Sequence, residues 1–226
     1  MDVKVLKQED ERAIILFKGT NHAFVNALRR QIMVGTPILA IEDVHFYENN
    51  GVMADEMLSH RLGLTPLKMD SKKYKAGDTV KLVLEKEGPG IVYSKDIKST
   101  DPKIEPSMPN IPLMKLGEGQ KLKVEMDAIV GTGKEHAKFQ PAVVSYTELP
   151  ILGKGKYKAD ILEMIVEEKQ RDIIPEKGEN IEYDPTTFVF TIESHGNMTP
   201  KELLANAVEE LTEKTKEFRK ELKNLS

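Results

Sequence analysis

The segment from Thr199 to Leu225 constrains the fold of this chain more than any other part of its sequence. Thr199-Pro200-Lys201-Glu202 is a capping box with proline at the first helical position, which predicts the start of a helix. A row of side chains follows at spacings that alternate between four and three: Leu204, Val208, Leu211, Thr215, Phe218, Leu222 and Leu225. We call this row the seam. Its period of 3.5 is typical of a helix packed along another helix, so the sequence predicts a partner for it.

A second amphipathic helix is predicted near the beginning of the chain. Residues 12–18 are expected to form a strand that is buried on both sides, because both of its alternating faces are apolar. Gly19-Thr20-Asn21 ends this strand and offers an N-cap for a helix over 22–34. Within that helix an apolar stripe recurs at helical spacing, formed by Phe24, Val25, Leu28 and Ile32.

The rest of the chain has mainly the pattern of short strands. Further strands are predicted at 3–6, 38–47, 79–85, 121–130 and 188–192. A short helix is predicted at 55–62, and four prolines mark 100–112 as a loop because proline cannot donate to a sheet ladder. Residues 156–170 have a helical spacing without a cap, so their structure stays open. Strands and helices do not alternate as regular βαβ units, which favours an α+β fold.

Composition excludes several classes of site. The 226 residues contain no cysteine, so disulfides, thiolate zinc sites and cysteine-ligated iron–sulfur clusters are not expected. The formal net charge is −4 and no basic stripe is visible, which argues against direct sequence-specific DNA binding. No apolar run approaches the roughly 20 residues of a membrane span, and the N-terminus lacks the apolar stretch of a signal peptide. We therefore expect a cytoplasmic protein without a cofactor.

Motifs for catalysis are also missing. Gly131-Thr-Gly133-Lys134 resembles part of a phosphate-binding loop, but the earlier glycine is absent and Glu135 stands where Ser or Thr would bind magnesium. The five histidines form no metal-binding pair, and no aspartate-rich group of a polymerase active site occurs. The sequence thus predicts no catalytic or metal-binding residue.

Three segments together resemble the alpha-type family of assembly subunits of DNA-directed RNA polymerase, in its archaeal form, the D-type subunits. The first begins with Asn26-Ala-Leu-Arg-Arg30 and continues to Asp43. The second runs from Gly51-Val-Met-Ala-Asp-Glu56 through His60-Arg-Leu-Gly-Leu-Thr-Pro66. The third is split into Lys134-Glu-His136-Ala-Lys138-Phe-Gln-Pro141 and Phe188-Val-Phe-Thr-Ile-Glu193-Ser194. These segments span most of the chain in the order of the family.

The resemblance implies a two-part fold. A dimerisation domain, a sheet with two packed helices, is expected from residues 1–46 and 183–226. A mostly β domain is expected to be inserted at 47–182. Many relatives carry a cysteine-rich iron–sulfur domain in the second half of the insert. Here the segment at 151–182 is short and lacks cysteine, so it is expected to be a reduced, cluster-free remnant.

The family also implies a function and a set of interface residues. The chain would be a non-catalytic assembly subunit that forms a heterodimer with a small L-type subunit, and would then dock the second-largest polymerase subunit and small adaptor subunits. Dimer contacts are expected at Phe24, Val25, Leu28, Ile32, Leu204, Val208, Leu211, Phe218 and Leu222. Docking contacts are expected at Asn26, Arg29, Arg30, Glu56, His60 and Arg61.

Alternatives stay open for each group. The apolar residues of both helices would also suit the core of the chain itself. Arg29 and Arg30 would also suit a solvated basic edge. Glu56, His60 and Arg61 would suit local hydrogen bonds. A structural role fits Lys134, His136 and Lys138 better than a phosphate patch does. Two other functions remain: a homodimeric interaction module outside transcription, and a small hydrolase or nucleotide-binding enzyme.

Overall fold

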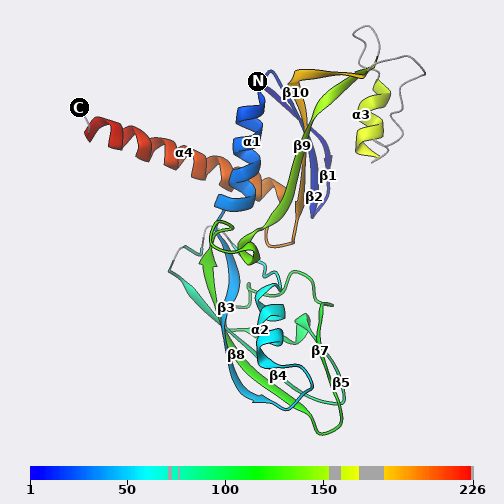
Figure 1. Cartoon of the computed structure of the whole chain (residues 1–226), viewed down its shortest axis with the longest axis vertical. Helices are drawn as coiled ribbons and strands as arrows, with labels where there is room; N and C mark the ends of the chain where they lie inside the picture. Colours follow the sequence, from blue (N-terminus) through cyan, green and yellow to red (C-terminus); the bar gives the residue numbers. More distant parts are fainter. Residues whose placement is uncertain (71–72, 76, 153–158, 168–180, 225–226) are drawn as a thin grey trace. The chain divides into compact units, whose positions relative to one another are not determined.

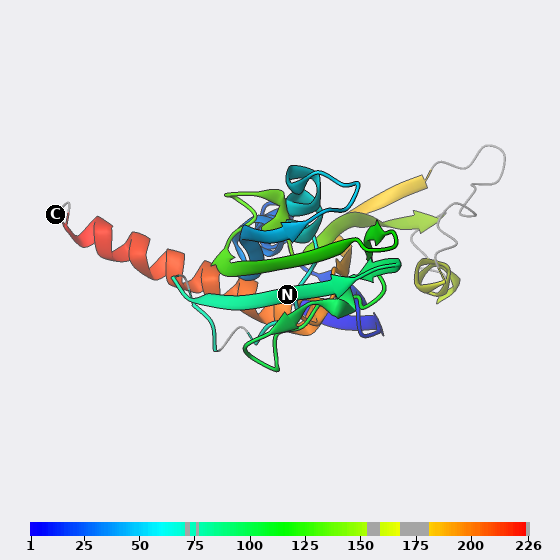
Figure 2. The same ribbon diagram turned by 90° about the horizontal axis from the view of Figure 1, so that it is seen from below.

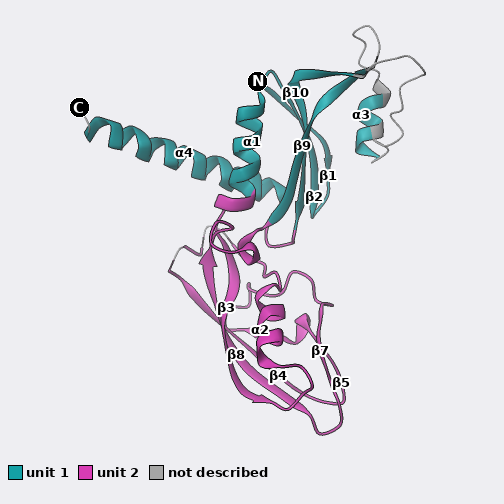
Figure 3. Cartoon of the chain, in the orientation of Figure 1, with its two compact units in different colours: residues 1–32, 142–194, 199–226 teal, residues 33–141, 195–198 magenta. Residues whose placement is uncertain are grey.

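The computed structural model describes residues 1–70, 73–75, 77–152, 159–167 and 181–224 (Figure 1). The chain forms two compact units (Figure 3). Unit 1 comprises residues 1–32, 142–194 and 199–226, and unit 2 comprises residues 33–141 and 195–198. The fold is α+β, with one unit built from both ends of the chain and a mostly β unit from its middle, as predicted.

The boundaries of the two units differ from those predicted. Residues 33–46 were expected with the chain ends but lie in unit 2, and residues 142–182 were expected in the insert but belong to unit 1. Strand pairing is the reason. The strand that begins at Ile38 pairs within the sheet of unit 2, whereas the strand that begins at Ala142 pairs within the sheet of unit 1. Side-chain alternation within a strand does not show which distant strand it pairs with.

Unit 1 contains a four-stranded antiparallel sheet in the order β1-β2-β10-β9. Its strands are β1 (Asp2–Gln8), β2 (Arg12–Lys18), β9 (Ala142–Leu152) and β10 (Ile181–Ser194), and its helices are α1 (His22–Arg30), α3 (Ala159–Val166) and α4 (Pro200–Asn224). The central strand β2 has five consecutive buried residues, which confirms the prediction that both of its faces are covered.

Helix α1 covers one face of this sheet. The ring of Phe17 on β2 meets that of Phe190 on β10 edge to face, with centroids 5.5 Å apart. The ring of His22, the first residue of α1, lies edge-on to that of Phe188, with centroids 4.8 Å apart. Its Nε2 also forms a hydrogen bond with Oε1 of Glu148 on β9. Aromatic pairs of this geometry add to the stabilisation that comes from burial alone.

The beginning of α1 confirms the predicted cap, and its end differs from prediction. The side chain of Asn21 accepts a hydrogen bond from the backbone N–H of Phe24 at 3.0 Å, as an N-cap residue does. The α-helix ends at Arg30, and a π-helical turn over Gln31–Gly35 completes the segment that was predicted as one helix to residue 34. The hydrophobic period alone does not distinguish an α-turn from a π-turn.

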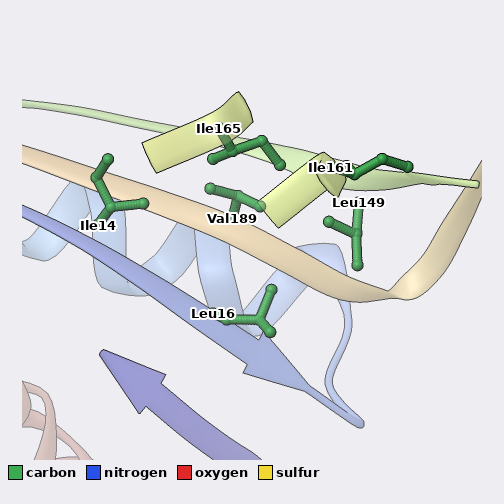
Figure 4. Close-up of a cluster of buried hydrophobic side chains, with 6 residues drawn as sticks. All are labelled: Ile14, Leu16, Leu149, Ile161, Ile165 and Val189. Carbon is green, nitrogen blue, oxygen red and sulfur yellow. The ribbon is translucent and has the colours of Figure 1, made fainter. Parts of the chain in front are cut away.

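Helix α3 covers the opposite face of the sheet (Figure 4). Its Ile161 and Ile165, one turn apart, are buried against a cluster that the strands provide, formed by Ile14, Leu16, Leu149 and Val189. The helix lies within 156–170, the stretch whose structure was left open. Most of the predicted remnant at 151–182 lies outside the described residues.

Unit 2 contains a second antiparallel sheet, a separate pair of short strands and one helix. The sheet has the order β3-β8-β4-β6, and a separate two-stranded sheet pairs β5 with β7. The elements are β3 (Ile38–Asn49), α2 (Asp55–Gly63), β4 (Thr79–Glu87), β5 (Gly90–Tyr93), β6 (Lys98–Ser99), β7 (Pro112–Leu116) and β8 (Lys121–Gly131), with 3₁₀ turns at Ser94–Asp96 and Ala137–Phe139. Pro102, Pro106 and Pro109 lie between β6 and β7 and outside these strands, as predicted. Pro112, which was expected in the same loop, is instead the first residue of β7, a position that proline tolerates in a strand.

Candidate subunit interface

Helix α4 carries two apolar stripes, and only one of them is fully buried on its own chain. Leu203 and Ala207, one turn apart, are completely buried near the start of the helix, where α4 contacts β2, β10 and α1. Within the described part of α4 no residue after Ala207 is buried. In both views the later turns of α4, drawn in red, extend beyond the sheet of unit 1 (Figures 1 and 2). The intramolecular anchor of the helix is therefore short.

The seam forms the other stripe, and it is largely exposed. Val208, Phe218 and Leu222 expose 47%, 64% and 48% of their surface, respectively. Leu204 and Leu211 are half-buried. Leu225, the last predicted member of the seam, lies outside the described residues. A row of exposed apolar side chains of this length is unusual on the surface of a monomeric protein. The seam is thus not part of the core of the chain, which was the alternative interpretation.

The apolar stripe of α1 has the opposite environment. Val25, Leu28 and Ile32 are at most 2% exposed and belong to the core of unit 1, so the prediction that they contact a partner is corrected. Their spacing turns all three side chains towards the sheet, because residues three and four apart share one helix face. Phe24 lies outside this face and exposes 40% of its surface. It is the one member of the stripe that is open to contact.

Two valines of β1 were not among the residues predicted from the sequence. Val3 and Val5 on this edge strand are about half exposed. Their register partners on β2 are Phe17 and Ile15, so both valines belong to the sheet face that α1 covers. The available signal was the alternation of Val3 and Val5 with Lys4, which indicates a strand with one apolar face. Whether this apolar face is buried or exposed depends on helices that are distant in the sequence.

The two arginines at the end of α1 have different surroundings. Nε and Nη2 of Arg29 both donate to Oδ1 of Asn26, at 3.2 and 3.1 Å, and both residues are half-buried. Arg30 is exposed, and its guanidinium has no hydrogen-bond or ion-pair partner among the described residues. Of the predicted docking residues on α1, Arg30 is therefore the one with a free charged group.

The predicted docking residues of α2 all lie on the surface of unit 2. Arg61 donates from Nη2 to the carbonyl oxygen of Pro112, which fits the alternative of local hydrogen bonding. Glu56 and His60 are exposed, and their side chains have no such partner within the described ranges. Their place on one short helix brings the three together within two turns.

The stretch from Gly131 to Lys138 has a structural role. A side chain at Gly131 would come within 2.7 Å of the Phe139 ring, and one at Gly133 would collide with the carbonyl oxygen of Met33. Nζ of Lys138 donates to the carbonyl oxygen of Ile41 at 2.9 Å and its side chain is mostly buried. The glycines thus permit close packing, which explains why the stretch only partly matches a phosphate-binding loop.

Groups suited to metal binding are not assembled in the described residues. No three His, Asp or Glu side chains of the described ranges are grouped so that they could hold a metal ion. The pKa of Asp101, in a loop of unit 2, departs furthest from its usual value. Hydrogen bonds from Lys73 and Tyr74 hold it well below that value. In the same ranges we find no helix that is both long and apolar enough to span a membrane.

Comparison with known proteins gives a consistent result. A family model described as the RNA polymerase Rpb3/RpoA insert domain matches residues 44–147. DNA-directed RNA polymerase subunit Rpo3 of Pyrococcus furiosus is 35% identical over the whole of this chain and 98% of its own length. The Rpo3 subunits of Methanobrevibacter smithii and Halobacterium salinarum are 36% and 37% identical over 96% of this chain, and the matches cover 97% and 95% of their lengths.

The matched insert model coincides largely with unit 2, and the relatives extend the likeness through all three segments of unit 1. Similarity at this level over the full chain, together with the α+β fold, shows the family. The chain belongs to the Rpo3 family of archaeal DNA-directed RNA polymerase subunits, the D-type subunits of that enzyme.

Proposed function

We propose that this polymerase subunit is a non-catalytic assembly platform that pairs with a small L-type subunit. The observation that carries the proposal is the exposed seam on α4, which the core of the chain leaves uncovered. A helix face with a period of 3.5 is complementary to another helix. Phe24 on α1 and Val3 and Val5 on β1 supply further exposed apolar surface in the same unit.

The energetics favour a permanent partner. Burying a large apolar side chain stabilises by about 1.5–3 kcal/mol relative to leaving it in water. Burial of the exposed members of the seam in an interface would therefore contribute several kcal/mol to the free energy of association. Obligate interfaces are more apolar than transient ones and resemble a domain core cut in half.

The platform would then recruit the larger polymerase subunit through polar groups. Arg30 offers a free guanidinium, which suits planar, two-pronged contacts with a carboxylate or with carbonyl groups of the second-largest subunit. Glu56, His60 and Arg61 on α2 offer a second set of contacts, to that subunit or to small adaptor subunits. Nucleotidyl transfer would take place elsewhere in the complex, in the cytoplasm.

We also propose that the chain holds no iron–sulfur cluster and no thiolate zinc site, because it contains no cysteine to ligate either. Visible absorbance typical of an iron–sulfur cluster in the pure heterodimer would contradict this part of the proposal.

Co-expression with an archaeal L-type subunit tests the central claim. Size-exclusion chromatography with light scattering should give one species with the summed mass of the two chains. A stable homodimer that does not bind the L-type subunit would overturn the proposal and would favour an interaction module outside transcription.

A further inference from the structure

Helix α4 has a polar attachment to unit 1 beyond the apolar anchor at its start. Nζ of Lys214 donates a hydrogen bond to the side-chain Oε1 of Gln31 at 2.8 Å, and we call this bond the tie. Lys214 lies about two helical turns beyond Ala207, the last buried residue of the described helix. Figure 1 shows α4 passing the C-terminal end of α1, which Gln31 follows. The tie therefore acts on the part of α4 that the anchor does not reach.

The acceptor of the tie is fixed in the core of unit 1. Gln31 begins the π-helical turn Gln31–Gly35 and is only 6% exposed. Its backbone N–H bonds to the carbonyl oxygens of Ala27 and Leu28, and the next residue, Ile32, is fully buried. Because a lysine ammonium can only donate, the amide oxygen of Gln31 faces it. Gln31 thus presents an oxygen atom in a position that the surrounding core holds.

The donor of the tie is not engaged elsewhere. Lys214 forms no ion pair with any carboxylate of the described residues. A hydrogen bond from a charged donor is stronger than one between neutral groups, so the neutral amide of Gln31 is still an effective acceptor. Lys216, by contrast, forms an ion pair with Glu213 of the same helix. One lysine thus joins α4 to the end of α1, and the other joins α4 to itself.

Lys214 also lies beside the seam. It follows Leu211 by three positions and precedes Phe218 by four, and residues at these spacings share a helix face. A helix is held together by its own backbone hydrogen bonds, so a contact that fixes one side chain also fixes the rotation of the neighbouring turns. The direction in which Phe218 and Leu222 point therefore depends on the tie.

We propose that Lys214 and Gln31 are positioning residues, which hold the described turns of α4 after Ala207 at the angle that the L-type subunit binds. The inference rests on the proposed function, because that subunit is the partner in question. A helix that already has this angle loses less conformational freedom when the partner binds. Without the tie, the apparent Kd rises in inverse proportion to the fraction of chains that have the competent angle.

Spin labels test the position of α4 directly. The chain contains no cysteine, so Lys220→Cys on α4 and Ser145→Cys on β9 provide two unique and exposed labelling sites in unit 1. Pulsed electron paramagnetic resonance on this chain, diluted with unlabelled chain, gives the distance distribution between the two labels. We expect a narrow distribution with the tie intact and a broad one after Lys214→Met. Addition of the L-type subunit should narrow the broad distribution.

The affinity for the L-type subunit tests the consequence. Lys214→Met should raise Kd roughly 10-fold, as expected if α4 then has the competent angle about a tenth of the time. Gln31→Met should act in the same way, and the double variant should bind no more weakly than either single variant. Lys214 is exposed, so its variant should fold even if Gln31→Met does not. Lys216→Met is the matched control, because it removes the same charge from the same helix and leaves the tie in place.

The possible outcomes separate this inference from the proposed function. If the heterodimer forms and Lys214→Met keeps the narrow distribution, the tie does not position α4, and the assembly role stands. Equal effects of Lys214→Met and Lys216→Met would also overturn the inference, since the lost charge would then be responsible. If the parent chain does not bind the L-type subunit at all, the proposed function fails, and the inference fails with it.

Discussion

At the scale of single residues, two adjacent arginines differ in whether their guanidinium groups have a hydrogen-bond partner within the described part of the chain. Arg29 and Arg30 are about 100° apart around α1. One guanidinium is held by Asn26 and the other is free among the described residues. The sequence names both as docking candidates, because adjacency alone does not show which one has a partner within the chain.

We therefore predict that Arg30→Ala weakens binding of the second-largest subunit to the heterodimer roughly 10- to 100-fold, since a charge-assisted hydrogen bond contributes about 1.5–3 kcal/mol. Arg29→Ala is the matched variant and should have the smaller effect on that affinity. Both variants should still form the heterodimer. Affinity measured by surface plasmon resonance checks this, and equal losses for the two arginines would contradict it.

A second residue-scale prediction concerns pH. Lys73 and Tyr74 hold the pKa of Asp101 below its unfolded value, so the ionised carboxylate stabilises the folded chain above about pH 4. That contribution is lost as the pH falls through the lower, folded-state pKa. Asp101→Asn should lower Tm near neutral pH, and the difference from the parent should shrink below about pH 4. A difference in Tm that does not change with pH would show that the charge of Asp101 is not involved.

At the scale of elements, α4 shows how one helix serves two purposes. Its first turns use Leu203 and Ala207 to anchor it, and the seam continues where the anchor ends. The seam was predictable, because its period is visible in the sequence. The adjacent anchoring stripe was not, because deciding between two neighbouring stripes requires the position of the sheet. For the same reason Val25, Leu28 and Ile32 were assigned to a partner although they form the core.

Phe218→Asp tests the seam. The side chain is exposed and far along the helix from the anchor, so the variant should fold normally. A carboxylate in an apolar interface costs about 3 kcal/mol, so heterodimer affinity should fall roughly 100-fold. Lys220→Asp makes a similar change on the polar side of α4 and should leave the affinity nearly unchanged. Analytical ultracentrifugation with the L-type subunit measures both.

Helix α3 gives a stability prediction at the same scale. Ile165→Ala removes a buried side chain from the cluster with Val189 and Ile14, and should lower the free energy of unfolding by about 2–4 kcal/mol. Glu163→Ala on the exposed side of α3 should change it by less than about 0.5 kcal/mol. Chemical denaturation of the heterodimer provides both values. Similar values for the two variants would mean that α3 does not contribute to the core.

At the scale of the whole molecule, the general architecture followed from the sequence and the boundaries between its units did not. The mixture of strands and helices and the resemblance of three segments predicted a unit made from both chain ends. The exact division depends on which strands pair across more than a hundred residues, as β2 does with β10. No local pattern records such a pairing.

The exposed seam also predicts the behaviour of the isolated chain. Without a partner, the apolar side chains of α4 remain in water, so the chain should self-associate as its concentration rises. Light scattering over a concentration series should show this, and addition of the L-type subunit should suppress it. Phe218→Asp should suppress it as well. A chain that stays monomeric at high concentration would argue that the seam is too weak to drive association.

The two-part construction of unit 1 has a consequence for synthesis. A ribosome releases β1, β2 and α1 first, yet the strands that complete their sheet, β9 and β10, follow more than a hundred residues later. Domains generally fold as units during translation. Most of unit 2 therefore emerges before β2 can pair with β10. Helix α4 emerges after all of these strands. The seam, the main surface that we propose for the L-type subunit, thus emerges only after every strand of both units, so pairing through the seam follows the synthesis of both sheets.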